Sequence, residues 1–180
     1  MVPGSTLTAV VDNAPWCREA AHSVRRDMSR FDLDKYLERI GLFGQIQSHN
    51  DARTGDGRVL SKDLSTLQSV LRHHTETIPF ENLSVLQRRQ IGLDTECLQR
   101  KLVEERRGGY CFEQNLLLSH ALEALGFKIK HVGGRVRWYL DSDLRIISPR
   151  THFFLLVLDV ESKGDVWVAD AGPVPTHVGL

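Results

Sequence analysis

The chain has 180 residues, of which 41% are hydrophobic and 26% charged, as in soluble globular proteins. Its 23 basic and 23 acidic residues cancel, so charge gives no basis for binding nucleic acid or an anionic membrane, and no apolar run approaches the roughly 20 residues of a membrane span. Three cysteines without a CxxC pair argue against a disulfide framework or a zinc site and fit a reducing cytoplasm.

Residues 1–30 differ from the rest of the chain because they contain no sustained apolar periodicity. They have neither the apolar core of a secretory signal nor the composition of an organelle transit peptide. Regular patterning begins directly after Met28. We therefore predict that residues 1–30 are a disordered extension, or that the initiation codon is assigned too far upstream.

Apolar side chains at helical spacing predict four helices in the first part of the chain. They cover Leu33–Ile40, a segment from Ser61 to His74, roughly residues 95–105, and a segment that starts at Cys111 and ends at Gly126. Asp32, Ser61 and Asp94 are the predicted N-caps. His73 and His74 are expected to interact only with the helix dipole and not to bind a metal.

From Phe127 onwards the apolar periodicity changes to two, which predicts β-strands. Alternation runs to Leu140, with a bulge or kink expected at Gly133–Gly134. An apolar strand follows at Thr151–Val160, and a turn at Ser162–Gly164 leads into a strand at Val166–Ala171. Helices followed by antiparallel strands define the α+β class.

The segment Arg106–Asn115 carries the strongest chemical signal. Two glycines let the backbone turn sharply before Cys111, which places the cysteine at or next to a helix N-terminus. There the free N–H groups and the helix dipole favour the thiolate, the nucleophilic form. A free cysteine alone is usually a small buried hydrophobic residue. His152 and Asp170 supply a base and a group that orients it, so the sequence predicts a cysteine–histidine–aspartate triad.

His152 and Asp170 fall near the same end of the predicted hairpin. They point to the same face if the register pairs residues whose numbers sum to an even value. A turn centred at Lys163 leaves them somewhat out of register. We therefore expect a bulge or a diagonal contact to bring the two side chains together.

Two motifs, RGGYCFEQN at Arg107–Asn115 and IPFENL at Ile78–Leu83, resemble those of the arylamine N-acetyltransferases. The order and spacing of the predicted cysteine, histidine and aspartate are also similar to those of this family. The resemblance runs from about Phe31 to Asp170, and the cysteine motif is long enough to be specific.

The resemblance implies a fold of two parts. An N-terminal helical bundle over residues 31–126 would carry the cysteine, and an antiparallel β-barrel over residues 127–180 would carry the histidine and the aspartate, as a cysteine-protease-like catalytic core. Family members continue well beyond the aspartate, so we expect a C-terminally truncated member with an incomplete barrel and without the family's C-terminal lid. Pro173–Leu180 is then either a divergent loop or the product of a frameshift or an incorrect gene model.

The resemblance also implies ping-pong acetyl transfer, with acetyl-CoA as co-substrate and no metal. Cys111 would take the acetyl group as a thioester and pass it to a small-molecule arylamine or arylhydrazine, as in the metabolism of foreign compounds. His152 would pair with the thiolate and carry the proton, and Asp170 would hold the tautomer of the imidazole. Neither nucleic acid nor a membrane is an expected partner.

Other positions take roles only from the resemblance. Phe80, Tyr110 and Val136 match positions near the acceptor pocket, although ordinary core packing is about equally expected for each. Glu81 and Arg107 match an ion pair that braces the site, and the alternative is two unrelated surface charges. The polar side chains after the cysteine, Glu113, Gln114 and Asn115, are expected to support the start of the helix.

Two other functions stay open at this point. The chain could be a truncated, catalytically inactive relative that is unstable or only binds a ligand or a partner. It could also be a hydrolase or a transglutaminase-like enzyme, because the same triad occurs across chemistries and does not choose the acyl donor. The two family motifs favour acetyl transfer over hydrolysis.

Overall fold

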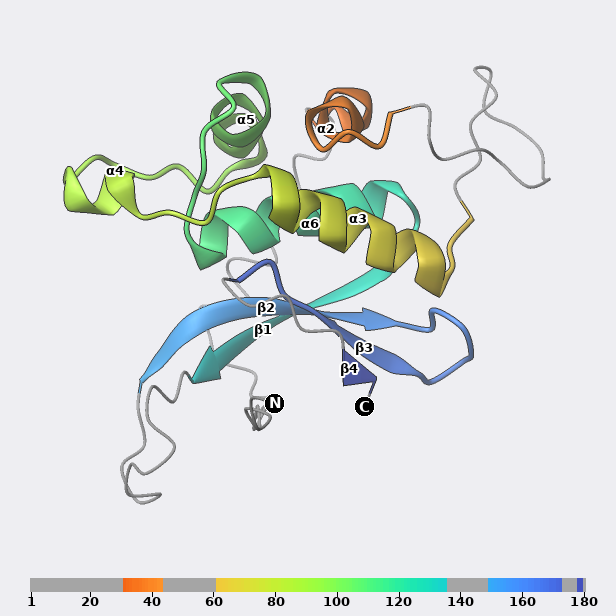
Figure 1. Ribbon diagram of the computed structural model, residues 1–180. Helices are drawn as coiled ribbons and strands as arrows, with labels where there is room; N and C mark the ends of the chain where they lie inside the picture. Colours follow the sequence, from red (N-terminus) through yellow and green to blue (C-terminus); the bar gives the residue numbers. More distant parts are fainter. Residues whose placement is uncertain (1–30, 44–60, 136–148, 173–177, 180) are drawn as a thin grey trace, which may run out of the picture.

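The computed structural model describes residues 31–43, 61–135, 149–172 and 178–179. These residues form two layers, in which the helices lie on one side of a four-stranded antiparallel sheet (Figure 1). The predicted α+β class is confirmed at this level. The predicted extension at residues 1–30 lies outside the described residues. Within the described ranges, no helix has the length and apolar character needed to cross a membrane.

The first two described helices begin at aspartate caps. The Asp32 carboxylate accepts the Lys35 N–H at 3.1 Å and starts α2 (Leu33–Arg39), as predicted. In α3 (Leu64–Thr77) the cap is Asp63, which accepts the Thr66 N–H at 2.8 Å. The predicted cap, Ser61, was wrong by two residues, because its hydroxyl donates to the Asp63 carboxylate and not to the helix.

The predicted third helix is two different elements. Asp94 caps a short α5 (Thr95–Leu98), which continues directly into a π-helix, η2 (Gln99–Glu104). A one-turn helix, α4 (Leu83–Leu86), comes earlier and has no counterpart among the predicted elements. Apolar spacing does not distinguish the wider π turn from an α turn, so the sequence pattern could not separate α5 from η2.

The helix α6 (Cys111–Ala124) is the central element of the helical layer. Eleven of its fourteen residues are buried, which places it between the other helices and the sheet. It ends before Gly126, whose φ of 87° is a conformation that favours glycine. Both predicted boundaries of this helix are therefore confirmed, and its first residue is Cys111.

His74 lies inside the helical layer, although the sequence predicted only an interaction with the helix dipole. Its ring is fully buried and bonds the Tyr36 hydroxyl at Nδ1 and the Gln114 side chain at Nε2. Burial lowers its pKa from 6.5 to about 4, with the Gln114 hydrogen bond acting in the opposite direction. The neighbouring His73 lies at the surface side, 3.1 Å from the carbonyl of Ile40.

The sheet has the order β1-β2-β3-β4, with every neighbouring pair antiparallel. Its strands are β1 (Lys128–Arg135), β2 (Arg150–Leu158), β3 (Val166–Ala169) and β4 (Val178–Gly179). The register of β1 against β2 shifts between Gly134 and Arg135, next to the predicted kink. β4 pairs with β3 inside Pro173–Leu180, the segment expected to be either a divergent loop or the product of a frameshift or an incorrect gene model. The four strands form an open sheet and not a closed barrel within the described ranges.

The two faces of β2 are both apolar, which explains its continuous apolar sequence. Phe153, Leu155 and Val157 belong to the core shared with the helices. Phe154 and Leu156 belong to a second cluster with Val132. Because successive side chains of a strand point to opposite faces, this strand separates the two clusters.

Candidate active site

Cys111 is the first residue of α6, and its helix start is held by a buried ion pair. The Glu113 carboxylate accepts the Tyr110 N–H at 3.3 Å and lies 2.6 Å from the Lys101 ammonium of η2. The two charged side chains are only 3% and 14% exposed. The carboxylate therefore satisfies a free N–H at the start of the helix while its charge is balanced by a cation from a neighbouring element.

The two glycines before Cys111 are required by close packing. A Cβ atom on Gly108 would lie 2.2 Å from the Pro79 carbonyl oxygen, and one on Gly109 would lie 2.8 Å from Cβ of Glu113. Gly109 also forms a parallel bridge with Phe80, and its N–H donates to the Pro79 carbonyl at 3.2 Å. The two sequence motifs thus lie side by side in the fold, and only glycine allows that approach.

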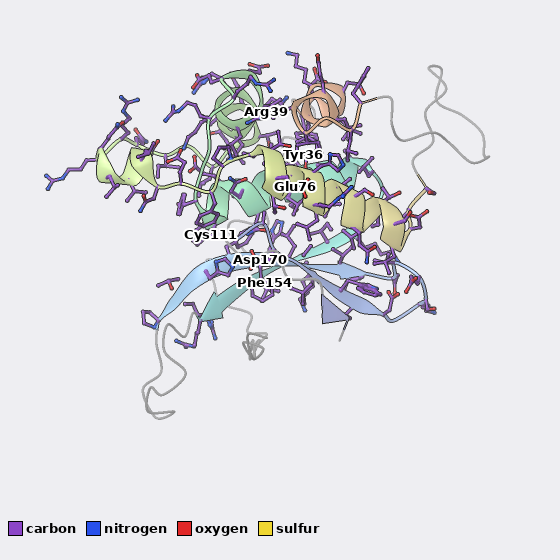
Figure 2. All side chains as sticks on the ribbon, in the orientation of Figure 1. Tyr36, Arg39, Glu76, Cys111, Phe154 and Asp170 are labelled. Atoms are coloured by element: carbon purple, nitrogen blue, oxygen red, sulfur yellow. The ribbon has the colours of Figure 1, made fainter. Side chains whose placement is uncertain are left out.

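His152 and Asp170 reach the cysteine from the sheet layer. Nε2 of His152 lies 2.6 Å from Oδ2 of Asp170, and the Cys111 thiol lies close enough to the ring to raise its pKa. The thiol donates to the carbonyl of Thr151, the residue before His152, at 3.8 Å. Leu155 lies opposite Ala169 in the hairpin, so the same register places Asp170 one diagonal step from His152. This is the diagonal contact expected from the sequence. Figure 2 shows Cys111 and Asp170 on the two sides of the junction between helices and sheet.

Asn115 is a site residue that the sequence reasoning did not identify beyond support of the helix start. Its amide nitrogen donates to the Phe153 carbonyl at 2.7 Å and to Oδ1 of Asp170 at 3.1 Å, and its oxygen accepts the Ala171 N–H at 2.8 Å. The signal that could have found it is its spacing of four from Cys111, which puts both side chains on one helix face. With one Asp170 oxygen held by Asn115, the other faces His152.

The charge on His152 follows from its surroundings. Burial by itself lowers the pKa of the ring, whereas the hydrogen bonds to Asp170 and to Cys111 and their negative charges raise it, with a net rise from 6.5 to about 9. The ring is therefore protonated at neutral pH and lies beside the thiol. Cys111 at the start of a helix and beside an imidazolium is in the position of a nucleophile.

The predicted ion pair between Glu81 and Arg107 is not formed among the described residues. The Glu81 carboxylate turns to the N–H of Leu83 at the start of α4. The Arg107 guanidinium donates instead to the Ser84 hydroxyl at 3.0 Å and lies 3.4 Å from the Glu105 carboxylate. The physical reason is that each group has a nearer partner, one a free helix N–H and the other an adjacent carboxylate.

The remaining predicted positions differ in accessibility. Phe80 is 42% exposed beside the glycine turn. Tyr110 is half-buried, and its ring lies 5.6 Å from that of Phe112, which stacks on Phe153. Val136 lies outside the described residues.

In the described part of the chain, no three histidine, cysteine, aspartate or glutamate side chains are grouped so that they could hold a metal ion.

Stability should be greatest near pH 6.5, because two histidines are shifted in opposite directions. The raised pKa of His152 adds stability that is complete below 6.5 and is lost as the pH rises towards 9. The lowered pKa of His74 means that the unfolded chain takes up the proton first, so stability falls as the pH drops from 6.5 towards 4. Each of these two losses should amount to roughly 3 kcal/mol of unfolding free energy.

Urea unfolding at pH 4.5, 6.5 and 9 measures the loss of unfolding free energy on both sides of pH 6.5. His152→Gln should reduce only the loss between pH 6.5 and 9, and His74→Gln should reduce only the loss between pH 6.5 and 4.5. A wild-type free energy of unfolding that stays constant over this range would contradict the assignment of either charge.

The fold and the site together define a class of protein: an α+β chain in which a thiol at a helix start, an imidazole and a carboxylate meet between a helical layer and an antiparallel sheet. Comparison with known proteins gives the family. The sequence model of the N-acetyltransferase family matches residues 63–174, which include all three of these side chains. The chain belongs to the arylamine N-acetyltransferase family.

Known relatives match the chain in both sequence and structure. The arylamine N-acetyltransferase of Escherichia coli is 42% identical over 127 residues, which are 71% of this chain and 43% of that protein. The arylamine N-acetyltransferase structure from M. smegmatis superposes with a TM-score of 0.64 at 38% identity, covering 79% of this chain and 46% of that one. The Mycobacterium marinum enzyme in complex with CoA gives 0.61 at 33% identity, covering 78% and 46%. The chain thus spans less than half the length of these relatives.

Proposed function

We propose that this protein transfers an acetyl group from acetyl-CoA to an arylamine or arylhydrazine through a thioester on Cys111. The observation that carries the proposal is that Cys111, His152 and Asp170 meet at one place. The thiol lies 3.8 Å from the carbonyl of Thr151, next to His152, and the His152 ring lies 2.6 Å from Asp170, which supplies a nucleophile, a base and a group that orients the base. Family membership supports acetyl transfer as the chemistry, and the known CoA complex of the M. marinum relative supports the donor.

The first half-reaction begins from a thiolate–imidazolium pair. The sulfur of Cys111 attacks the acetyl carbonyl carbon of acetyl-CoA, and the carbonyl oxygen becomes an oxyanion. The backbone N–H of Cys111, at the start of α6, is placed to stabilise this charge. When the intermediate collapses, the bond from carbon to the coenzyme sulfur breaks, and the proton on His152 goes to the departing thiolate.

The second half-reaction returns the site to its starting state. The amine nitrogen attacks the thioester carbon while the now neutral His152 removes a proton from it. The carbon–sulfur bond then breaks, the acetylated amine leaves, and Cys111 and His152 again form an ion pair. Asp170 remains ionised throughout and, through Nε2, directs the other ring nitrogen, Nδ1, to the thiol.

The proposal includes two finer points of architecture. Residues 31–126 are a helical bundle that carries Cys111, and residues 127–180 contribute part of a β-barrel that carries His152 and Asp170. Phe80 and Tyr110 lie beside the cysteine turn with part of their rings accessible, and we place them in the acceptor pocket together with Val136.

The reduced thiol that this chemistry needs is consistent with a cytoplasmic location.

Intact-mass spectrometry after incubation with acetyl-CoA tests the proposal. The folded protein should gain about 42 Da on Cys111 and lose it when an arylamine is added. A gain that water alone discharges at the same rate would instead indicate a hydrolase. A folded protein that gains no mass would contradict acetyl transfer and indicate a relative without turnover.

A further inference from the structure

A buried chain of hydrogen bonds lies directly behind the glycine turn that precedes α6. The Tyr36 hydroxyl lies 2.9 Å from Nδ1 of His74, and Nε2 of His74 lies 2.8 Å from Oε1 of Gln114. The amide nitrogen of Gln114 donates to the carbonyl of Pro79 at 2.7 Å and to that of Gly109 at 3.3 Å. The three linking side chains are at most 1% exposed.

The donor and the acceptor of each hydrogen bond in this series can be assigned by starting from the backbone carbonyls at one end. A carbonyl oxygen only accepts, so the Gln114 nitrogen faces the backbone and its oxygen is left to accept. His74 therefore donates from Nε2, and its neutral ring accepts at Nδ1 from the Tyr36 hydroxyl. This single arrangement connects α2 and α3 to the turn before the thiol.

The turn needs such a support because glycines do not fix their own backbone conformation. Gly109 is paired with the neighbouring segment through two backbone hydrogen bonds, from its N–H to Pro79 and from the Glu81 N–H to its carbonyl. The Gln114 amide binds both segments where they pair. Its loss would leave the turn held by the two backbone hydrogen bonds and by packing alone, and would loosen the position of Cys111 relative to His152.

We propose that His74 is a positioning residue for Cys111, acting through Gln114 on the two backbone segments that hold the thiol beside His152. His74 does not touch the reacting atoms. By donating to the Gln114 oxygen, it fixes the orientation of the amide, so that the amide nitrogen continues to donate to the carbonyls of Pro79 and Gly109. The role concerns the placement of the thiol, which alkylation measures directly, so its test does not depend on the proposed acetyl transfer.

The test is the rate of Cys111 alkylation by iodoacetamide as a function of pH, resolved by peptide mass spectrometry. Cys97, in the same molecule, is the internal reference. His74→Leu removes both polar atoms of the ring, and we expect it to slow Cys111 alkylation about tenfold at neutral pH and to move the profile to higher pH, because a thiol displaced from its imidazolium loses its activation. Cys97 should react as before.

Three comparisons separate positioning from a purely structural role. His74→Gln keeps one donor and one acceptor and should restore most of the alkylation rate. His73→Leu, the same change one residue earlier, should leave the rate unchanged. If His74→Leu lowers the melting temperature but leaves the Cys111 profile of the folded protein unchanged, His74 only stabilises the fold and the proposal is wrong.

The outcome is interpretable even if a variant or the proposed activity fails. Should His74→Leu not fold, Tyr36→Phe removes only the hydroxyl at the far end and should still slow Cys111 alkylation, by about threefold; an unchanged rate there overturns the proposal. Should the wild-type protein accept no acetyl group, the proposed function is contradicted, yet the alkylation comparison still decides whether His74 positions the thiol.

Discussion

Replacing Cys111 by serine should abolish acetyl transfer, with a fall in turnover on the order of 10⁴-fold or more. The hydroxyl is close in size to the thiol but does not ionise beside an imidazolium at neutral pH, so the attacking group is lost while the fold is kept. Cys111 is 7% exposed in a packed junction, and because oxygen is smaller than sulfur the substitution introduces no steric strain. The measurement is the acetyl adduct by intact mass, followed by single-turnover transfer to an arylamine.

The matched control is Cys97→Ser. Cys97 is a free cysteine of α5 whose nearest partners are the Asp94 cap and the Arg100 guanidinium, far in the sequence from the sheet residues of the site. The adduct and the transfer rate of Cys97→Ser should equal those of the wild type. Full acetylation of Cys111→Ser would mean that another nucleophile accepts the acetyl group.

Asp170→Asn should lower the rate of thioester formation by roughly 10³–10⁴-fold. The carboxylate accepts from His152, from Asn115 and from the Gly172 N–H, so an amide would present a donor to at least one existing donor. The tautomer of the imidazole would no longer be fixed, and the pKa of His152 would fall back towards its ordinary value of about 6.5. A larger fraction of His152 would then be neutral at pH 7.5, which weakens the thiolate–imidazolium pair.

Single-turnover kinetics and NMR titration of the His152 ring measure the two effects together. Asp159→Asn in the same hairpin is the control, because Asp159 has a φ of 55°, which asparagine tolerates, and its carboxylate bonds Lys128 and the Gly164 N–H, away from the site. It should leave both quantities unchanged. An Asp170→Asn protein that forms the thioester at the wild-type rate would remove Asp170 from the mechanism.

The sequence predicted best the features that depend on neighbouring residues. The Asp32 and Asp94 caps and the two ends of α6 are local signals, since a cap bonds an N–H only three residues along the chain. The α5–η2 break is also local in position, but the apolar pattern contains no signal for a π turn. The helix α3 is capped by Asp63 and not by the predicted Ser61, which is the usual uncertainty of two residues in helix starts.

Features that depend on distant segments were predicted only in part. The contact of His152 with Asp170 followed from strand alternation and turn position, which limit the register to a few choices. The role of His74 did not, because its partners come from two other helices and its sequence position looks like any helix end. The ion pair of Glu81 with Arg107 was predicted from the resemblance alone, and it does not form because each side chain bonds a nearer group.

The three bonds of Asn115 to the sheet layer bear on the order of events during synthesis. The helix that carries Cys111 leaves the ribosome well before the hairpin that carries His152 and Asp170, so for that interval the nascent chain holds an ordinary thiol with no base beside it. Because Asn115 bonds both Asp170 and the backbone next to His152, docking of the hairpin onto this side chain brings the base and its orienting carboxylate to the helix together. Cys111 in a partly opened molecule should therefore react more slowly with electrophiles, and the rate of its alkylation should report the fraction of molecules in which the hairpin is docked.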